Sequence, residues 1–157
     1  LGVSHTAMHG VYHITDGATI VGPNQKTTLD GDLFIITNGR VEIRRDFDTV
    51  SKGTYRLVIV STSTSMSPAA ILWSNNITMP PNVQTLLFTY GLAEFTQLKT
   101  FSGIVYAGRV DTDNNFSITY EPSLKTTVPG FDWDLSSARA YEIRPLAWTE
   151  CRSPTQC

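Results

Sequence analysis

The chain is built from short stretches of β-branched and aromatic residues, which Gly, Pro, Asn and Asp interrupt at regular intervals. Such stretches favour strands, and the residues between them favour tight turns. We expect strands at 11–15, 33–37, 40–44, 55–61, 70–74, 84–90, 103–110, 116–120 and 139–144. Because no helical segments alternate with these strands, the rhythm predicts an all-β fold, an antiparallel sandwich or barrel with at most one or two short helices.

The clearest local signal is a hairpin in which Asn38-Gly39 joins strands 33–37 and 40–44, since Asn-Gly suits a type I′ turn. The first of these strands is apolar on both faces, which indicates cover on both sides. Residues 83–98 partly fit a helix, but Gly91 and a preceding double proline favour strand, turn, strand. A short helix is also compatible with 135–140.

Length and composition limit the domain organisation and the partners. The 157 residues suit one domain over 1–157, and we expect 1–10 and 152–157 to be loosely ordered ends, with no internal repeat or linker. With 12 basic and 14 acidic residues, the chain lacks the basic excess that nucleic-acid binding requires. No apolar run is long enough for membrane insertion. The chain begins at Leu1, so we expect a fragment of a longer protein.

No catalytic or metal motif stands out. His5, His9 and His13 are evenly spaced, but a strand would spread them too far apart for one metal ion. Asp132 and Asp134 could form a glycosidase pair, although nothing else in the chain supports that reaction. Cys151 and Cys157 are the two cysteines; they are either unpaired thiols or a short terminal disulfide, and Cys151 could also pair with a partner. We therefore expect no enzyme, no cofactor and no metal.

Several short blocks resemble the trypsin-released head domain of the rotavirus outer-capsid spike protein. They are Leu29-Asp30-Gly31 with 33–41, the strand at 54–60, Glu94-Phe95, the block 101–109 with Tyr106 and Arg109, and 141–145 followed by Cys151. The chain departs from the family at Ala69-Ala70-Ile71, where some members carry an arginine that contacts sialic acid. It therefore resembles a divergent member, such as one from a non-A rotavirus.

The resemblance implies a galectin-like sandwich of two antiparallel sheets that attaches a virus to host-cell carbohydrate. The implied place is the outer capsid surface of the virion, and the other implied partner is the remainder of the viral spike protein. Sugar-binding sites combine an aromatic ring with bidentate hydrogen-bonding side chains on a rigid scaffold. A β fold can supply such a scaffold, which agrees with that role.

The candidate ligand-binding residues are Tyr106 and Arg109, which match the family strand, together with Trp73, Asn75 and Tyr90. For Tyr106 the alternative is a core or cross-strand aromatic residue, and for Arg109 it is a surface ion pair with Asp111 or Asp113. Tryptophans are more often core residues than ligand platforms. The competing function is a structural or protein-receptor-binding protrusion of a viral capsid or fibre, which predicts an exposed apolar patch.

Overall fold

The computed structural model describes residues 7–15, 17–74, 77–96, 100–112, 117–121 and 124. The chain divides into two units, Leu1–Thr127 and Val128–Cys157, and the second unit lies outside the described residues. The single domain over 1–157 stays a prediction. The helix expected at 135–140, the strand expected at 139–144 and both cysteines also lie outside the described residues.

The described part of the first unit is all-β, as predicted. Its strands are β1 (Met8–Ile14), β2 (Thr19–Val21), β3 (Thr27–Thr37), β4 (Val41–Ile43), β5 (Phe47–Thr49), β6 (Tyr55–Ser61), β7 (Ile71–Trp73), β8 (Val83–Phe95), β9 (Thr100–Thr112) and β10 (Ser117–Tyr120). The predicted strand 55–61 coincides with β6, and the other predicted strands among the described residues overlap strands of the structure.

The predicted antiparallel two-sheet sandwich is wrong, because these strands pair in parallel. The hairpin predicted at Asn38-Gly39 is also wrong. β3 lies between β1 and β6, whereas β4 lies between β2 and β7. The chain bends at Asn38-Gly39 and continues in the same rotational direction instead of folding back as a hairpin. The galectin-like arrangement is therefore not formed.

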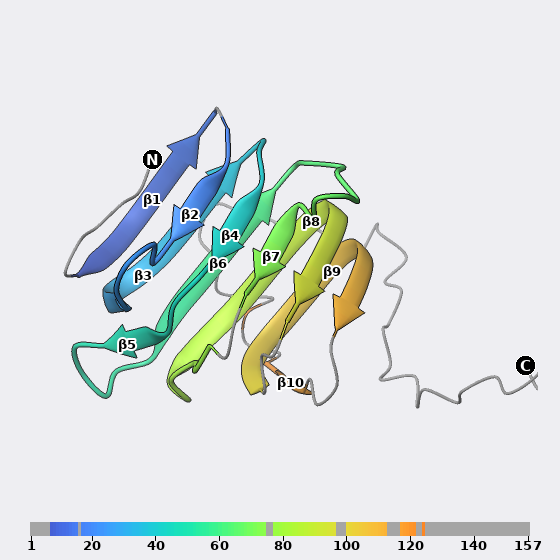
Figure 1. Ribbon diagram of the computed structural model, residues 1–157. Helices are drawn as coiled ribbons and strands as arrows, with labels where there is room; N and C mark the ends of the chain where they lie inside the picture. Colours follow the sequence, from blue (N-terminus) through green and yellow to red (C-terminus); the bar gives the residue numbers. More distant parts are fainter. Residues whose placement is uncertain are drawn as a thin grey trace, which may run out of the picture. The chain divides into compact units, whose positions relative to one another are not determined.

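The parallel pairing arises because the chain winds in stacked coils (Figure 1). We call the side formed by β1, the 29–37 part of β3, β6, and the first parts of β8 and β9 the long side. The short side consists of β2, β4, β7 and the last parts of β8 and β9. Parallel strands usually need a helical crossover. Here the strands of the short side carry the chain back to the start of the next coil.

The coils form an internal repeat that we did not expect from the sequence. Residues at the same place in successive coils are in register, in rows such as Leu33, Leu57, Thr85 and Gly103, or Ile35, Ile59, Leu87 and Val105. The spacing along the chain between stacked residues varies from 17 (Ala93 to Val110) to 30 (Val41 to Ile71). This variation hides the repeat, because a repeat is recognised in a sequence by a constant period.

The segment 83–98 contains one long strand rather than a helix or the predicted pair of strands. β8 runs through Val83–Phe95 and passes from the long side to the short side at Gly91. A Cβ atom at Gly91 would overlap the carbonyl oxygen of Ser65 and lie 2.9 Å from the Cβ of Ala70. Glycine is therefore required at this bend by the close approach of the preceding coil.

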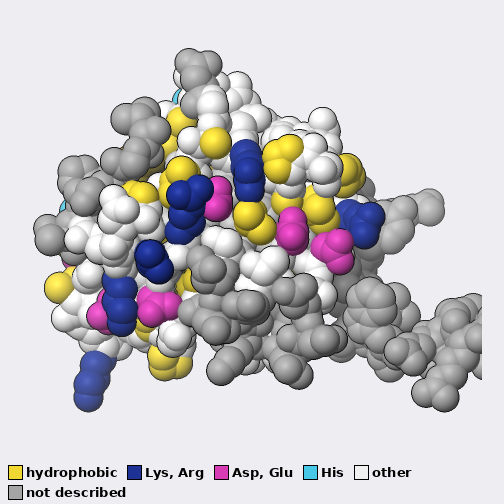
Figure 2. Space-filling model, in the orientation of Figure 1, with side chains coloured by type: hydrophobic (Ala, Val, Ile, Leu, Met, Phe, Trp, Pro, Cys, Tyr) yellow, Lys and Arg dark blue, Asp and Glu magenta, His cyan; other side chains and the backbone are white. Residues whose placement is uncertain are grey.

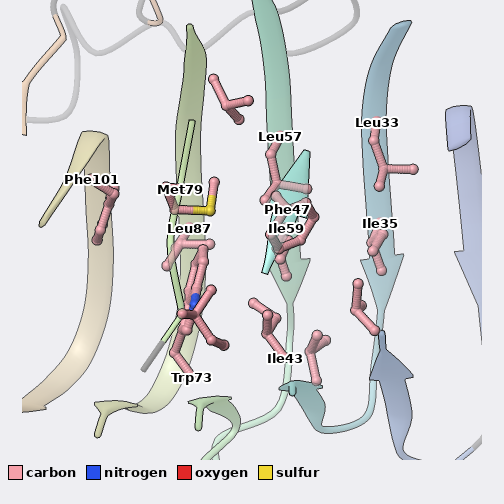
Figure 3. Packing of buried hydrophobic residues seen from close by; sticks show 14 of the residues in the cluster. Leu33, Ile35, Ile43, Phe47, Leu57, Ile59, Trp73, Met79, Leu87 and Phe101 are labelled. Atoms are coloured by element: carbon pink, nitrogen blue, oxygen red, sulfur yellow. The ribbon is translucent and has the colours of Figure 1, made fainter. Parts of the chain in front are cut away.

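The interior between the sides is filled by aliphatic and aromatic side chains (Figure 3). Trp73 is fully buried and stacks on Phe101, with ring centroids 5.7 Å apart and planes 9° apart, and also on Phe95 at 6.1 Å. Phe47 also contacts the indole, with centroids 6.2 Å apart and planes tilted by 49°. Aromatic rings bury large areas and carry much of the stability of such cores.

One interior row is polar. Thr37, Ser61 and Thr89, which we call the hydroxyl ladder, are buried at the end of the long side on three successive coils. Each hydroxyl accepts a hydrogen bond from the N–H two residues ahead: Gly39 to Thr37 at 3.0 Å, Ser63 to Ser61 at 3.3 Å and Gly91 to Thr89 at 3.1 Å.

Two of these hydroxyls also bind the preceding coil. Ser61 donates to the carbonyl of Gly39 at 2.7 Å, and Thr89 donates to the carbonyl of Ser63 at 3.1 Å. The chain leaves the sheet at this corner, so its amides and carbonyls lose their strand partners. The ladder replaces those partners with hydroxyl groups, as buried backbone groups require.

The ladder predicts that Thr89→Val destabilises the protein by about 1–3 kcal/mol, because the N–H of Gly91 loses a buried hydrogen bond and the carbonyl of Ser63 loses a partly buried one, while side-chain volume is kept. Urea unfolding measures this change. Thr62→Val is the matched control, since Thr62 is exposed, and it should change stability by less than about 0.5 kcal/mol. Equal effects of the two substitutions would contradict the role of the ladder.

Candidate functional site

Three of the five predicted site residues lie around one corner, where β8 and β9 pass from the long side to the short side. Tyr106 is the register partner of Phe88, and Arg109 is the partner of Leu92. Tyr90 lies between these pairs, beside Gly108, where a Cβ atom would overlap the carbonyl oxygen of Tyr90. We call this region the Tyr90–Arg109 corner. Gly108 allows the two coils to approach closely there.

The aromatic part of the corner is held by packing. Phe88 and Tyr90 form an edge contact, with centroids 5.1 Å apart and planes at 82°. Tyr90 is nevertheless 58% exposed, so its ring is oriented by Phe88 and still accessible to solvent. Tyr106 is half-buried on the neighbouring strand, which agrees with the cross-strand interpretation of that residue. Phe88 was not predicted, because its role depends on strand register.

The polar part of the corner follows on β9. Arg109 donates from Nη2 to Oδ2 of Asp111 at 3.1 Å, which confirms the ion pair considered for this residue. Both side chains are more than half exposed. Glu94 of β8 is the register partner of Asp111, so two carboxylates lie side by side on adjacent strands. Figure 2 shows acidic and basic side chains together on the visible face of the molecule.

Of the other two predicted residues, one lies in the core and the other lies outside the described residues. Trp73 is fully buried among Phe47, Phe95 and Phe101, so it is a core residue, and no ligand reaches its ring. Asn75 lies outside the described residues. Residues 69–73 are all apolar, so the sequence gives no sign of which face of the strand Trp73 occupies.

The residues that we weighed for metal binding and catalysis do not form a site among those described. His9 bonds to Asp30 through Nδ1 at 2.8 Å on the surface, and His5, Asp132 and Asp134 lie outside the described residues. No group of three or more metal-ligating side chains is found in the described part. The hollow beside the first coil is lined by apolar side chains such as Met8, Tyr12 and Ile35.

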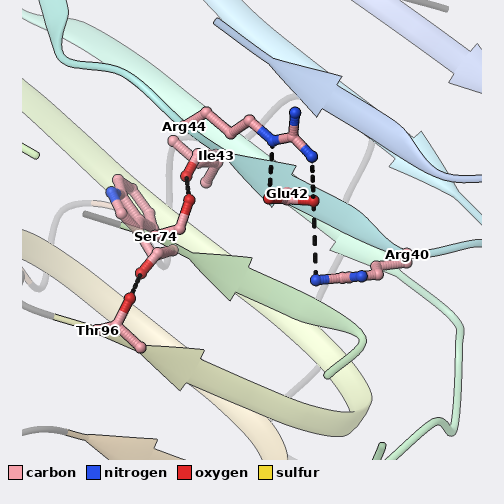
Figure 4. A network of polar contacts seen from close by, with 7 residues as sticks. Arg40, Glu42, Ile43, Arg44, Ser74 and Thr96 are labelled. Atoms are coloured by element: carbon pink, nitrogen blue, oxygen red, sulfur yellow. Dashed lines mark hydrogen bonds and ion pairs between the residues drawn. The ribbon is translucent and has the colours of Figure 1, made fainter. Parts of the chain in front are cut away.

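A second charged cluster lies on the outer face of β4 (Figure 4). Arg44 donates to both oxygens of Glu42, at 2.7 and 3.1 Å, and Arg40 approaches the same carboxylate at 3.7 Å. The hydrogen bonds from Arg44 lower the pKa of Glu42 below its ordinary 4.5, although burial opposes the shift. Nearby, Ser74 and Thr96 donate to the carbonyls of Ile43 and Trp73 at 3.0 and 3.1 Å, which joins successive coils.

The lowered pKa of Glu42 predicts a pH-dependent contribution to stability. Ionised Glu42 stabilises the folded state above pH 4.5, and this contribution is lost as the pH falls below 4.5 through the lower folded-state value. Glu42→Gln should therefore reduce stability at pH 6 by less than about 1 kcal/mol, because the pair is partly solvated. At pH 3 the substitution should matter less. Urea unfolding at both pH values measures the difference, and an equal effect at both would contradict it.

Comparisons with protein-family models, with curated proteins and with solved structures find no match to this chain. Within the described residues, the structure contains no helix that is both long and apolar enough to cross a membrane.

Proposed function

We propose that the protein is a non-catalytic carbohydrate-binding module and that the Tyr90–Arg109 corner binds the sugar. The observation that carries the proposal is the accessible ring of Tyr90, which Phe88 contacts edge-on, at a corner where the backbone of Tyr90 lies against Gly108, the residue before Arg109. A sugar ring offers an apolar face for stacking and hydroxyl groups for bonding, and these two chemistries lie next to each other at the corner.

The geometry favours recognition because the groups are ordered before a ligand arrives. Packing against Phe88 orients Tyr90, and the ion pair with Asp111 orients Arg109. The remaining N–H groups of Arg109 and the carboxylates of Asp111 and Glu94 supply donors and acceptors within one patch. Preordered groups lose less conformational entropy on binding, which matters for weak ligands such as sugars.

The proposed setting is attachment to host-cell carbohydrate from the outer surface of a virion, with the remainder of a viral spike protein as the other partner. This setting rests on the short blocks that resemble the rotavirus spike head, and not on the sandwich fold of that family. A single shallow sugar site binds weakly, so attachment would depend on many copies acting together.

A second candidate function is a structural or protein-receptor-binding protrusion. It is favoured by Val11, which is 68% exposed on β1, the edge strand of the described long side, and by the apolar hollow beside the first coil. Exposed apolar groups at a sheet edge suit a protein partner better than a sugar.

Substitution at the corner tests the carbohydrate proposal. Tyr90→Ala and Arg109→Ala should each weaken binding of a saccharide by about 5- to 30-fold, since each removes a contact worth about 1–2 kcal/mol. The measurement is saturation-transfer NMR with a panel of monosaccharides, followed by titration with each saccharide that gives a signal.

Matched variants control for general effects of the substitutions. Tyr120→Ala removes another exposed tyrosine, and Arg45→Ala removes another exposed arginine; both should leave sugar affinity unchanged. Trp73→Phe should lower stability by about 1–3 kcal/mol without changing affinity, because Trp73 lies in the core. Saccharide binding that survives the loss of both Tyr90 and Arg109 would overturn the proposal.

A further inference from the structure

We propose that the Tyr90–Arg109 corner selects uncharged sugars and discriminates against sugars that carry a carboxylate. The inference rests on the proposed carbohydrate-binding function and specifies its ligand class. The residues that would determine the specificity are Glu94 and Asp111, neither of which we had identified as a site residue from the sequence.

The first step is the position of the two carboxylates. Glu94 and Asp111 are register partners on β8 and β9, so their backbones are separated by one strand spacing, about 4.8 Å. Glu94 belongs to the outward row of the short side, since its neighbours Ala93 and Phe95 are buried in the core, and Asp111 is its exposed register partner. Asp111 lies two residues from Arg109 on the same strand, so any ligand held by Arg109 approaches both carboxylates.

The second step is that the charge of Arg109 is already balanced by an acidic residue. Its guanidinium donates to Asp111 at 3.1 Å, so an incoming carboxylate would have to compete with this partner. Glu94, in contrast, forms no ion pair within the described part of the chain, and its charge is not balanced there. The three charged groups of the corner therefore sum to one negative charge.

The third step is the distance to other cations. Arg40 precedes Val41, whose register row runs through Ile71 and Ala93 to Val110, so the backbones of Arg40 and Arg109 are three strand spacings, or about 14 Å, apart. Arg40 is also directed to Glu42, at 3.7 Å. At physiological ionic strength, a charge at this distance is largely screened. Arg40 is thus a weak partner for an acidic sugar held at Arg109.

A neutral sugar meets none of this repulsion. Its hydroxyl groups donate to carboxylates and accept from guanidinium groups, so Glu94, Asp111 and Arg109 all remain useful partners. A ligand carboxylate is disfavoured, because Glu94 and Asp111 are also negatively charged and Arg109 is already paired with Asp111. The corner is therefore suited to hydroxyl recognition and poorly suited to carboxylate recognition.

Matched sugar pairs test the inference directly. Galactose and galacturonate differ only at C6, which is a hydroxymethyl group in galactose and a carboxylate group in galacturonate. Glucose and glucuronate differ in the same way. Titration followed by saturation-transfer NMR should give about fivefold tighter binding of the neutral member at physiological ionic strength, and the ratio should decrease as salt is raised further. Stronger binding of the acidic member would overturn the inference and leave the carbohydrate function standing.

Charge-neutral variants then identify the residues responsible. Glu94→Gln and Asp111→Asn should each shift the neutral-to-acidic ratio toward the acidic sugar by about two- to fivefold, and Asp111→Asn also releases Arg109. Asp48→Asn is the matched control, because it removes one exposed negative charge from β5, away from the corner, and it should leave the ratio unchanged.

The outcomes are distinguishable. A ratio that changes equally in the Asp48 control and in the corner variants would show that overall charge, and not these two carboxylates, sets the preference, and it would overturn the assignment. If neither member of any pair binds to the unmodified protein, the proposed carbohydrate function itself fails.

Discussion

Hydrogen bonding at the corners is the constraint on which the described fold depends. A parallel strand receives its partners from the coils before and after it, but the chain must leave the sheet wherever the long side ends. At that point the buried hydroxyls of Thr37, Ser61 and Thr89 take over, each accepting from the chain ahead. The hydrogen bonds that Ser61 and Thr89 donate to the preceding coil also fix the position of one coil relative to the next. Apolar residues in these places would leave amides without partners, at a cost that a small core tolerates poorly.

The existence of the strands could be predicted from the sequence, but their direction could not. β-branched residues and turn signals identify segments such as β6, because these preferences act locally. Whether two strands run parallel or antiparallel depends on the path between them, and Asn38-Gly39 suits a hairpin as well as it suits a corner. The apolar character of both faces of 33–37 was the available indication of parallel pairing.

The dependence of strand pairing on the path of the chain also explains which parts of the candidate site were predictable. Tyr90, Tyr106 and Arg109 were proposed from residue type and from the resemblance to a viral head domain, and the structure places them together. Phe88 and Glu94 could not be found, since their relevance comes from register across β8 and β9. Trp73 shows the converse, because residue type alone suggested a ligand platform while packing makes it the centre of the core.

The ladder and the candidate site are parts of one structural unit. Thr89 immediately precedes Tyr90, and its hydroxyl accepts from the N–H of Gly91, so the backbone on both sides of Tyr90 is tied to one buried group. That hydroxyl in turn donates to Ser63 on the preceding coil. The next residue of the row, Ala107, has no hydroxyl, and Gly108 allows β9 to close directly onto Tyr90. The position of Tyr90 relative to Arg109 therefore follows from the same interactions that stack the coils, and a change that loosens the ladder at Thr89 would also disturb the geometry of the corner.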